Sequence, residues 1–88
     1  MYPNNIIQLD ASGSDIKLYP NPCFDELHIS GPQEYDMKSI EIYNCQGKMV
    51  SVFNPAKIIR IKSLKSGIYL LKITTKDELY YNRTFIKQ

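Results

Sequence analysis

The side chains best suited to nucleophilic or metal chemistry in this sequence are Cys23, Cys45 and a single histidine, His28. A thiol beside an imidazole could act as a nucleophile with its base. Cys23 and His28 stand five residues apart, however, and an odd separation points two side chains to opposite faces of a strand. These three residues cannot complete a zinc site without carboxylates, and two cysteines cannot build a disulfide framework. We therefore predict no catalysis, no metal and no cofactor.

The two cysteines are interpreted as small, half-buried hydrophobic residues, which is the usual state of free cysteine. A disulfide between them stays open as an alternative in an oxidising compartment. Two further motif matches have structural explanations. "KDEL" at Lys76–Leu79 is internal and is predicted to be a turn that opens a strand, and "NRT" at Asn82–Thr84 is a weak glycosylation pattern within a predicted strand. The seven tyrosines are typical of half-buried strand positions.

Alternation of apolar and polar residues dominates the chain from Asp15 onward and predicts strands with one buried face. It occurs in "IKLYP", "ELHIS" and "SIEIYN", and again in Met49–Phe53, around Ile59 and Ile61, in Ile68–Thr74 and in Leu79–Ile86. Turn residues separate these segments, at Asn44–Gly47 with Gly47 supplying a positive φ, and at Lys76–Glu78. About seven short strands at this spacing predict an all-β fold, an immunoglobulin-like antiparallel β-sandwich. The last two segments form its longest hairpin.

Composition and charge limit the possible partners. A chain of 88 residues fits one domain, and 11 basic and 9 acidic residues are interspersed with a net charge of +2, so nucleic acid is not an expected partner. No apolar run approaches the roughly 20 residues that span a bilayer, and the first residues lack the pattern of a signal peptide. We expect residues 1–14 to be a flexible linker and residues 15–88 to be the domain. We also expect the chain to be the C-terminal piece of a longer protein whose export signal lies elsewhere. Met1 would then be an added residue and not part of that protein.

The stretch "YPNP" predicts a stiff corner between the first two strands. Pro20 and Pro22 fix two φ angles and remove two backbone donors. The last strand is expected within or at the edge of a sheet, with Phe85 and Ile86 buried. Lys76 and Lys87 on its flanks would discourage pairing with another chain, although an edge-strand dimer stays possible.

Four segments carry a family resemblance: "IKLYPNPCFDELHI", "IEIYNCQGKMV", "LKSGIYLLKI" and "RTFIKQ". In this order and spacing they resemble the type IX secretion system (Por secretion system) C-terminal sorting domain, type A, over Asp15–Gln88. The resemblance implies a non-enzymatic label at the end of cargo proteins of Bacteroidota-type bacteria. Such cargo reaches the periplasm through an N-terminal signal peptide. The outer-membrane translocon and a shuttle protein then recognise the domain, and the cargo reaches the cell surface or the medium. A sortase removes the domain and can join the cargo to lipopolysaccharide.

The resemblance also implies site residues. The recognition positions are Tyr19, Pro20, Asn21, Pro22, Gly47, Lys48, Gly67, Tyr69, Phe85, Ile86, Lys87 and Gln88, and the cleavage region is Ala11, Ser12, Gly13, Ser14 and Asp15. Within this set we predict that the last strand and the Gly67–Tyr69 region form the recognition surface. Asn44, Cys45 and Cys23 depart from the residues usual in the family. The alternative function is an immunoglobulin-like adhesion or carbohydrate-binding module, for which three exposed aromatic residues on one sheet face are expected.

Overall fold

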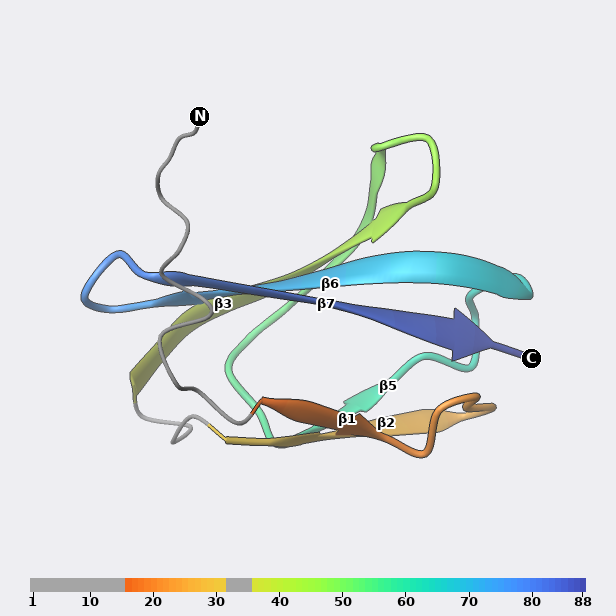
Figure 1. Ribbon diagram of the computed structural model, residues 1–88, viewed down its shortest axis with the longest axis horizontal. Helices are drawn as coiled ribbons and strands as arrows, with labels where there is room; N and C mark the ends of the chain where they lie inside the picture. The colour runs from red at the N-terminus through yellow and green to blue at the C-terminus, as the bar shows by residue number, and fades with distance from the viewer. Residues whose placement is uncertain (1–15, 32–35) are drawn as a thin grey trace.

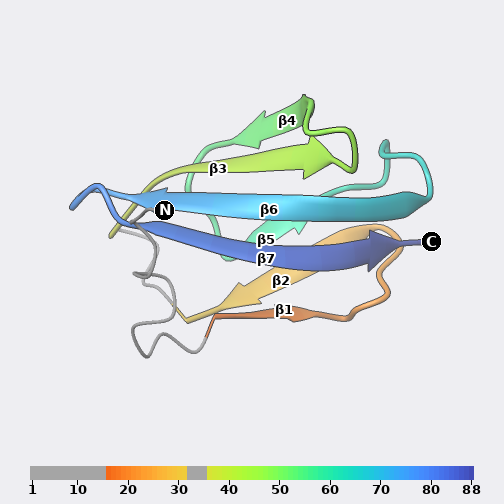
Figure 2. The same cartoon turned by 45° about the horizontal axis from the view of Figure 1, so that its top comes forward.

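Seven strands in two antiparallel sheets form the part of the chain that the computed structural model describes, residues 16–31 and 36–88 (Figure 1). The strands are β1 (Lys17–Tyr19), β2 (Glu26–Ser30), β3 (Met37–Asn44), β4 (Met49–Phe53), β5 (Ile58–Arg60), β6 (Gly67–Thr75) and β7 (Tyr80–Lys87). One sheet has the order β1-β2-β5 and the other the order β4-β3-β6-β7. Figure 1 shows the two sheets as separate layers, and Figure 2 shows the four-stranded sheet in front of β5. The predicted all-β immunoglobulin-like sandwich is confirmed.

The core lies between the two sheets and follows the period of two in each strand. In β6, Tyr69, Leu71 and Ile73 are buried while Ile68 points outward with 59% of its surface exposed. The facing sheet contributes Leu27 and Ile29 of β2. Other buried members are Ile40, Ile42, Ile59, Ile61 and Phe85. Most of these positions follow the alternation in the sequence, because β2, β3 and β6 each turn one face toward the core. Among the described residues, no helix has the length and apolarity needed to cross a membrane.

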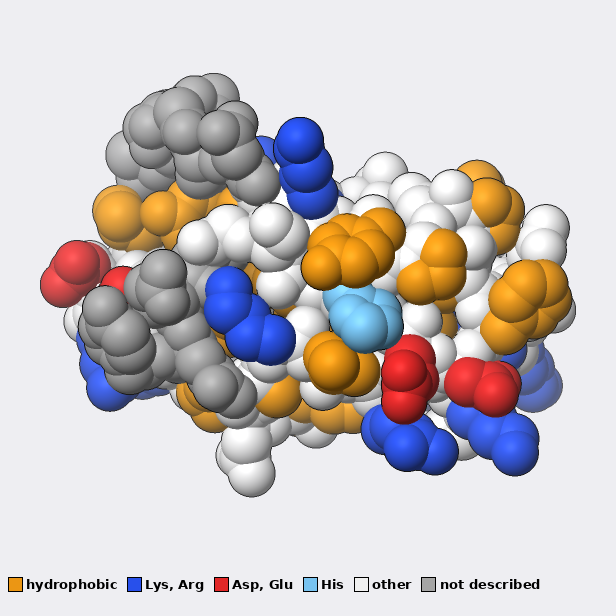
Figure 3. All heavy atoms as spheres, turned by 90° about the horizontal axis from the view of Figure 1, so that it is seen from below, with side chains coloured by type: hydrophobic (Ala, Val, Ile, Leu, Met, Phe, Trp, Pro, Cys, Tyr) orange, Lys and Arg blue, Asp and Glu red, His pale blue; other side chains and the backbone are white. Residues whose placement is uncertain are grey.

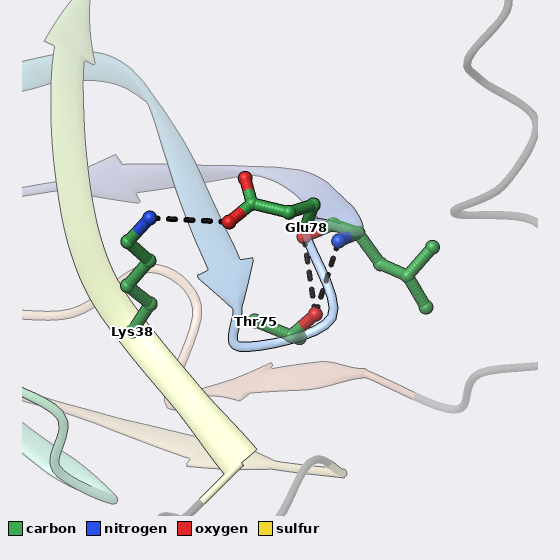
Figure 4. Close-up of polar contacts among 4 residues, drawn as sticks. Lys38, Thr75 and Glu78 are labelled. Carbon is green, nitrogen blue, oxygen red and sulfur yellow. Dashed lines mark hydrogen bonds and ion pairs between the residues drawn. The ribbon is translucent and has the colours of Figure 1, made fainter.

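The β6–β7 hairpin closes at the "KDEL" segment, as predicted. The Thr75 amide donates to the carbonyl of Leu79 (2.9 Å), and the Thr75 hydroxyl accepts a hydrogen bond from the Leu79 amide (3.1 Å). Glu78 has a φ of 66° and reaches Lys38 of β3 at 3.2 Å (Figure 4). The long register that follows, from Thr74↔Tyr80 to Gly67↔Lys87, makes this the longest hairpin of the sandwich.

The β3–β4 turn uses the chemistry expected of Asn44–Gly47. The Asn44 side-chain oxygen accepts hydrogen bonds from the amides of Gln46 (2.9 Å) and Lys48 (3.0 Å). Gly47 has a φ of 82°, which a side chain would disfavour, so the predicted need for glycine is confirmed. Asn44 departs from the family pattern, yet its side chain replaces backbone contacts within the turn.

Candidate functional site

The four motif segments, which are far apart in the sequence, lie together at one end of the sandwich. Figures 1 and 2 show that the β1–β2 loop, the β3–β4 turn, the start of β6 and the end of β7 all lie at this end. The strand register agrees, because Asn44 pairs with Tyr69, Tyr69 with Phe85, and Gly67 with Lys87. We call this region the motif end, which comprises residues 19–25, 44–48, 67–69 and 85–88. It includes every described recognition position predicted from the sequence.

The β1–β2 loop contacts the last strand directly. The side-chain oxygen of Asn21 accepts a hydrogen bond from the Ile86 amide at 2.8 Å. The Cys23 amide donates to the Ile86 carbonyl at 2.9 Å, and the Gln88 amide donates to the Cys23 carbonyl at 2.8 Å. The expected corner between the first two strands is confirmed, with both Tyr19–Pro20 and Asn21–Pro22 peptide bonds cis. Its contact with β7 was not foreseen, because no local pattern links residues more than 60 positions apart.

Tyr69 and Phe85 anchor the motif end to the core. Their rings are stacked, with centroids 5.6 Å apart and planes inclined by 22°. The Tyr69 hydroxyl donates to the Lys65 carbonyl at 2.6 Å, so the ring is buried and its polar atom is satisfied. These two predicted recognition positions therefore hold the sheet together rather than present a surface.

Two expectations for the last strand are wrong. Ile86 was expected to be buried, but 43% of its surface is exposed. Lys87 was expected to be an exposed charge that prevents another chain from pairing with β7, but only 8% of its surface is exposed. The reason is the pleat of β7. Phe85 points into the core, so Ile86 points outward and Lys87 inward again. The aliphatic part of the Lys87 side chain is buried, and its ammonium group, which is only partly buried, donates to the Gln88 carbonyl at 3.0 Å.

The cysteines lie in opposite environments rather than both half-buried. Cys23 is fully buried and forms an isolated parallel bridge with Lys87, whereas Cys45 is exposed in the β3–β4 turn. Both thiols are free. Cys23 lies outside β2, so the strand argument that separated it from His28 did not apply. His28 instead stacks on Tyr19 on the outer face of the three-stranded sheet, with ring centroids 5.1 Å apart.

Thiol reactivity is expected to separate the two cysteines. Burial raises the pKa of the Cys23 thiol, an effect that outweighs the opposing charge of nearby Lys87. Because the thiolate is the reactive form, Cys45 should react with a disulfide reagent at least about 100-fold faster than Cys23 under native conditions. Time-resolved mass spectrometry of the modified peptides would measure both rates, and a denaturant control should make them similar. Similar rates without denaturant would contradict the buried position of Cys23.

The outer face of the three-stranded sheet tests the carbohydrate-binding alternative. Figure 3 shows hydrophobic and acidic side chains gathered around the histidine on this face. An open hollow of about 410 Å³ there is lined by Pro20, Phe24, Asp25, Glu26, His28 and Arg60. Tyr19 and Phe24 are exposed nearby, but Tyr80 lies on the other sheet. The described residues therefore do not place three exposed aromatic rings on one sheet face. Nor do they contain a group of three or more His, Cys, Asp or Glu that could hold a metal.

Comparison with known proteins decides the family. A family model described as "Secretion system C-terminal sorting domain" matches residues 17–88. The chain belongs to this family. The sorting domain is also 34% identical over 77 residues to an "Endo-acting ulvan lyase" of Formosa agariphila, a match that covers 83% of this chain and 15% of the lyase. The chain thus spans about 15% of the length of this relative.

Membership has direct consequences for function. A sorting domain of this family is a C-terminal signal for type IX secretion, and the secretion machinery recognises it. It directs export to the cell surface or the extracellular space, and the domain itself is not catalytic. The resemblance found in the sequence is confirmed. The predicted cleavage region, residues 11–15, and the predicted linker, residues 1–14, both lie outside the described residues.

Proposed function

We propose that this domain is a removable sorting signal for a cargo protein whose sequence precedes residue 15. The cargo crosses the inner membrane with an N-terminal signal peptide and passes through the periplasm. The type IX translocon and its outer-membrane shuttle protein then recognise residues 15–88. A sortase cleaves within residues 11–15 and can transfer the cargo to lipopolysaccharide. The match of the family model to residues 17–88 is the observation that carries this proposal.

The recognition surface proposed here is the motif end, centred on the outer face of β6 and β7. Ile68 and Ile86 are direct cross-strand partners, and both point away from the core, with 59% and 43% of their surfaces exposed. Adjacent exposed aliphatic side chains on a preformed hairpin offer apolar contact without the cost of ordering the backbone. Gly47 and Lys48 lie at the same end in the β3–β4 turn. One folded module can in this way present the same surface behind many different cargoes.

Surface substitution within this hairpin tests the proposed recognition surface. A reporter with a signal peptide is fused to residues 10–88 and expressed in a host with a type IX system. We expect surface delivery of the intact fusion and at least about a tenfold loss for the double variant Ile68→Ser with Ile86→Ser. Loss of delivery should not come from unfolding, since exposed positions change stability little. Surface labelling and cell fractionation would measure delivery.

A matched control distinguishes the loss of this surface from the effect of adding a polar residue anywhere on the sheet. Val52 of β4 is 58% exposed and lies on the opposite edge of the same sheet. Val52→Ser should be delivered like the intact fusion. Delivery of the Ile68 and Ile86 double variant at the same level would show that the outer face of the β6–β7 hairpin is not the recognition surface. Failure of the intact fusion to reach the surface would contradict the sorting function itself.

A further inference from the structure

The end of β7 is held on both of its edges. On one edge it pairs with β6, with Ile86 opposite Ile68 and Lys87 opposite Gly67. On the other edge the β1–β2 loop supplies an acceptor for the Ile86 amide, a donor for the Ile86 carbonyl and an acceptor for the Gln88 amide. We call this set of three hydrogen bonds the loop clasp. An edge strand normally leaves such groups open to another chain, so the loop occupies the place of a neighbouring strand.

Asn21 has a distinct part in the clasp. Two of the three bonds use the Cys23 backbone, which any residue except proline provides, but the Ile86 amide is satisfied by the Asn21 side chain. The prolines on either side of Asn21 restrict its backbone. Because the Ile86 amide is a donor, the side chain that satisfies it from this position must be short and carry an acceptor. An amide or a carboxylate at this position meets that need, and an aliphatic side chain of the same size does not.

The geometry points to Asn21 as a positioning residue of the sorting signal, which acts by holding the end of β7 rather than by contacting the secretion machinery. This inference rests on the proposed function of the motif end. The first and last motifs then form a single unit, in which the loop fixes the strand that presents Ile86. The clasp also blocks the edge of β7 over Ile86–Gln88, so another strand can add there only by displacing the loop.

Amide hydrogen exchange in the 88-residue chain tests the clasp without reference to secretion. In Asn21→Leu, which keeps the side-chain size and removes the acceptor, we expect the Ile86 and Gln88 amides to exchange about five- to tenfold faster than in the wild type. The Ile73 amide, which lies toward the hairpin end of β6 and away from Ile86, should not change. Asn21→Asp retains an acceptor and should keep Ile86 near its original rate. Asn54→Leu, at an exposed asparagine of the loop after β4, is the matched control.

Outcomes of the exchange experiment are decisive in either direction. Faster exchange at Ile86 and Gln88 alone supports the clasp, and an unchanged Ile86 rate in Asn21→Leu overturns it. Faster exchange at Ile73 as well would mean that the substitution loosens the whole sandwich, which also overturns a local clasp. The alkylation rate of Cys23 in a Cys45→Ser background gives a second reading. It should rise about five- to tenfold in Asn21→Leu and stay low in Asn21→Asp.

Delivery of the reporter fusion distinguishes positioning from direct contact. Asn21→Leu should lower surface delivery, and Asn21→Asp should restore it, because the aspartate keeps the hydrogen bond while it changes the chemistry of the exposed group. Equal loss in both variants would show that the machinery reads the amide itself and would overturn the positioning role. If the intact fusion is not delivered, the proposed function fails, while the exchange experiment still decides whether the clasp exists.

Discussion

Replacing Phe85 by alanine is expected to lower the free energy of unfolding by about 3–5 kcal/mol. The ring is 1% exposed, and it stacks on Tyr69 between the two sheets near the motif end. Its removal deletes a large apolar surface and leaves a cavity that the rigid β6–β7 pairing cannot close. Domains of this size are stable by only about 5–15 kcal/mol, so much of the total would be lost. Chemical denaturation followed by circular dichroism would measure the change.

The neighbouring residue provides a matched control for Phe85. Ile86 follows directly in β7 but points outward, so Ile86→Ala should cost about 1 kcal/mol or less. The comparison separates a structural role from a surface role within one motif. A similar loss of stability in the two variants would contradict the register of β7. A small loss in Phe85→Ala alone would mean that the core tolerates the cavity.

Ile73→Asp is expected to unfold the domain and to abolish surface delivery of a fused reporter. Ile73 is fully buried in β6 within the apolar core cluster, where a carboxylate would lie among hydrophobic side chains. Burying an unpaired charge costs more than a small domain can supply, so the unfolded state should dominate. If the machinery recognises a folded surface, as we propose, the reporter should remain in the cell. Circular dichroism of the isolated domain and surface labelling of the fusion would check the two parts.

Lys72→Ser is the control for this substitution. Lys72 precedes Ile73, points outward and places its ammonium 4.4 Å from the centre of the Tyr80 ring. Loss of that contact should cost about 1 kcal/mol or less and leave delivery intact. Total reporter must be measured by immunoblot so that degradation is not mistaken for retention. Normal delivery of an unfolded Ile73→Asp fusion would show that the machinery recognises the motifs as linear sequence.

Local patterns were sufficient for most of the fold. Alternation found the strand faces of β2, β3 and β6, because a sheet with one buried face imposes a period of two on the sequence. The turns at Asn44–Gly47 and Lys76–Glu78 were predicted from residue chemistry, since few residues adopt a positive φ or replace backbone contacts. The side chains of Ile86 and Lys87 point the opposite way from the prediction, because Ile86 was placed inside for its hydrophobicity although the period of two in β7 places it outside.

The candidate site was also predicted only in part. The motif positions were found from the resemblance, but their separate roles were not. Tyr69 and Phe85 were grouped with the recognition positions, and the structure buries both of them, Phe85 as expected. The sequence also suggested that Cys23 and Cys45 have the same environment. Cys23 is buried only because the β1–β2 loop returns to the end of β7, a contact that depends on how the two sheets pack.

The sequence by itself determined the strands, most of their buried faces, the two turns and, through its motifs, the family, because each of these is recorded in short segments of the chain. Only the tertiary structure decided that the four motifs meet at one end of the sandwich and that Asn21 holds the Ile86 amide. Those relations join residues of different segments, which in the case of Asn21 and Ile86 are 65 positions apart. They arise from the closure of two sheets around one core, and no local periodicity records which strand ends become neighbours.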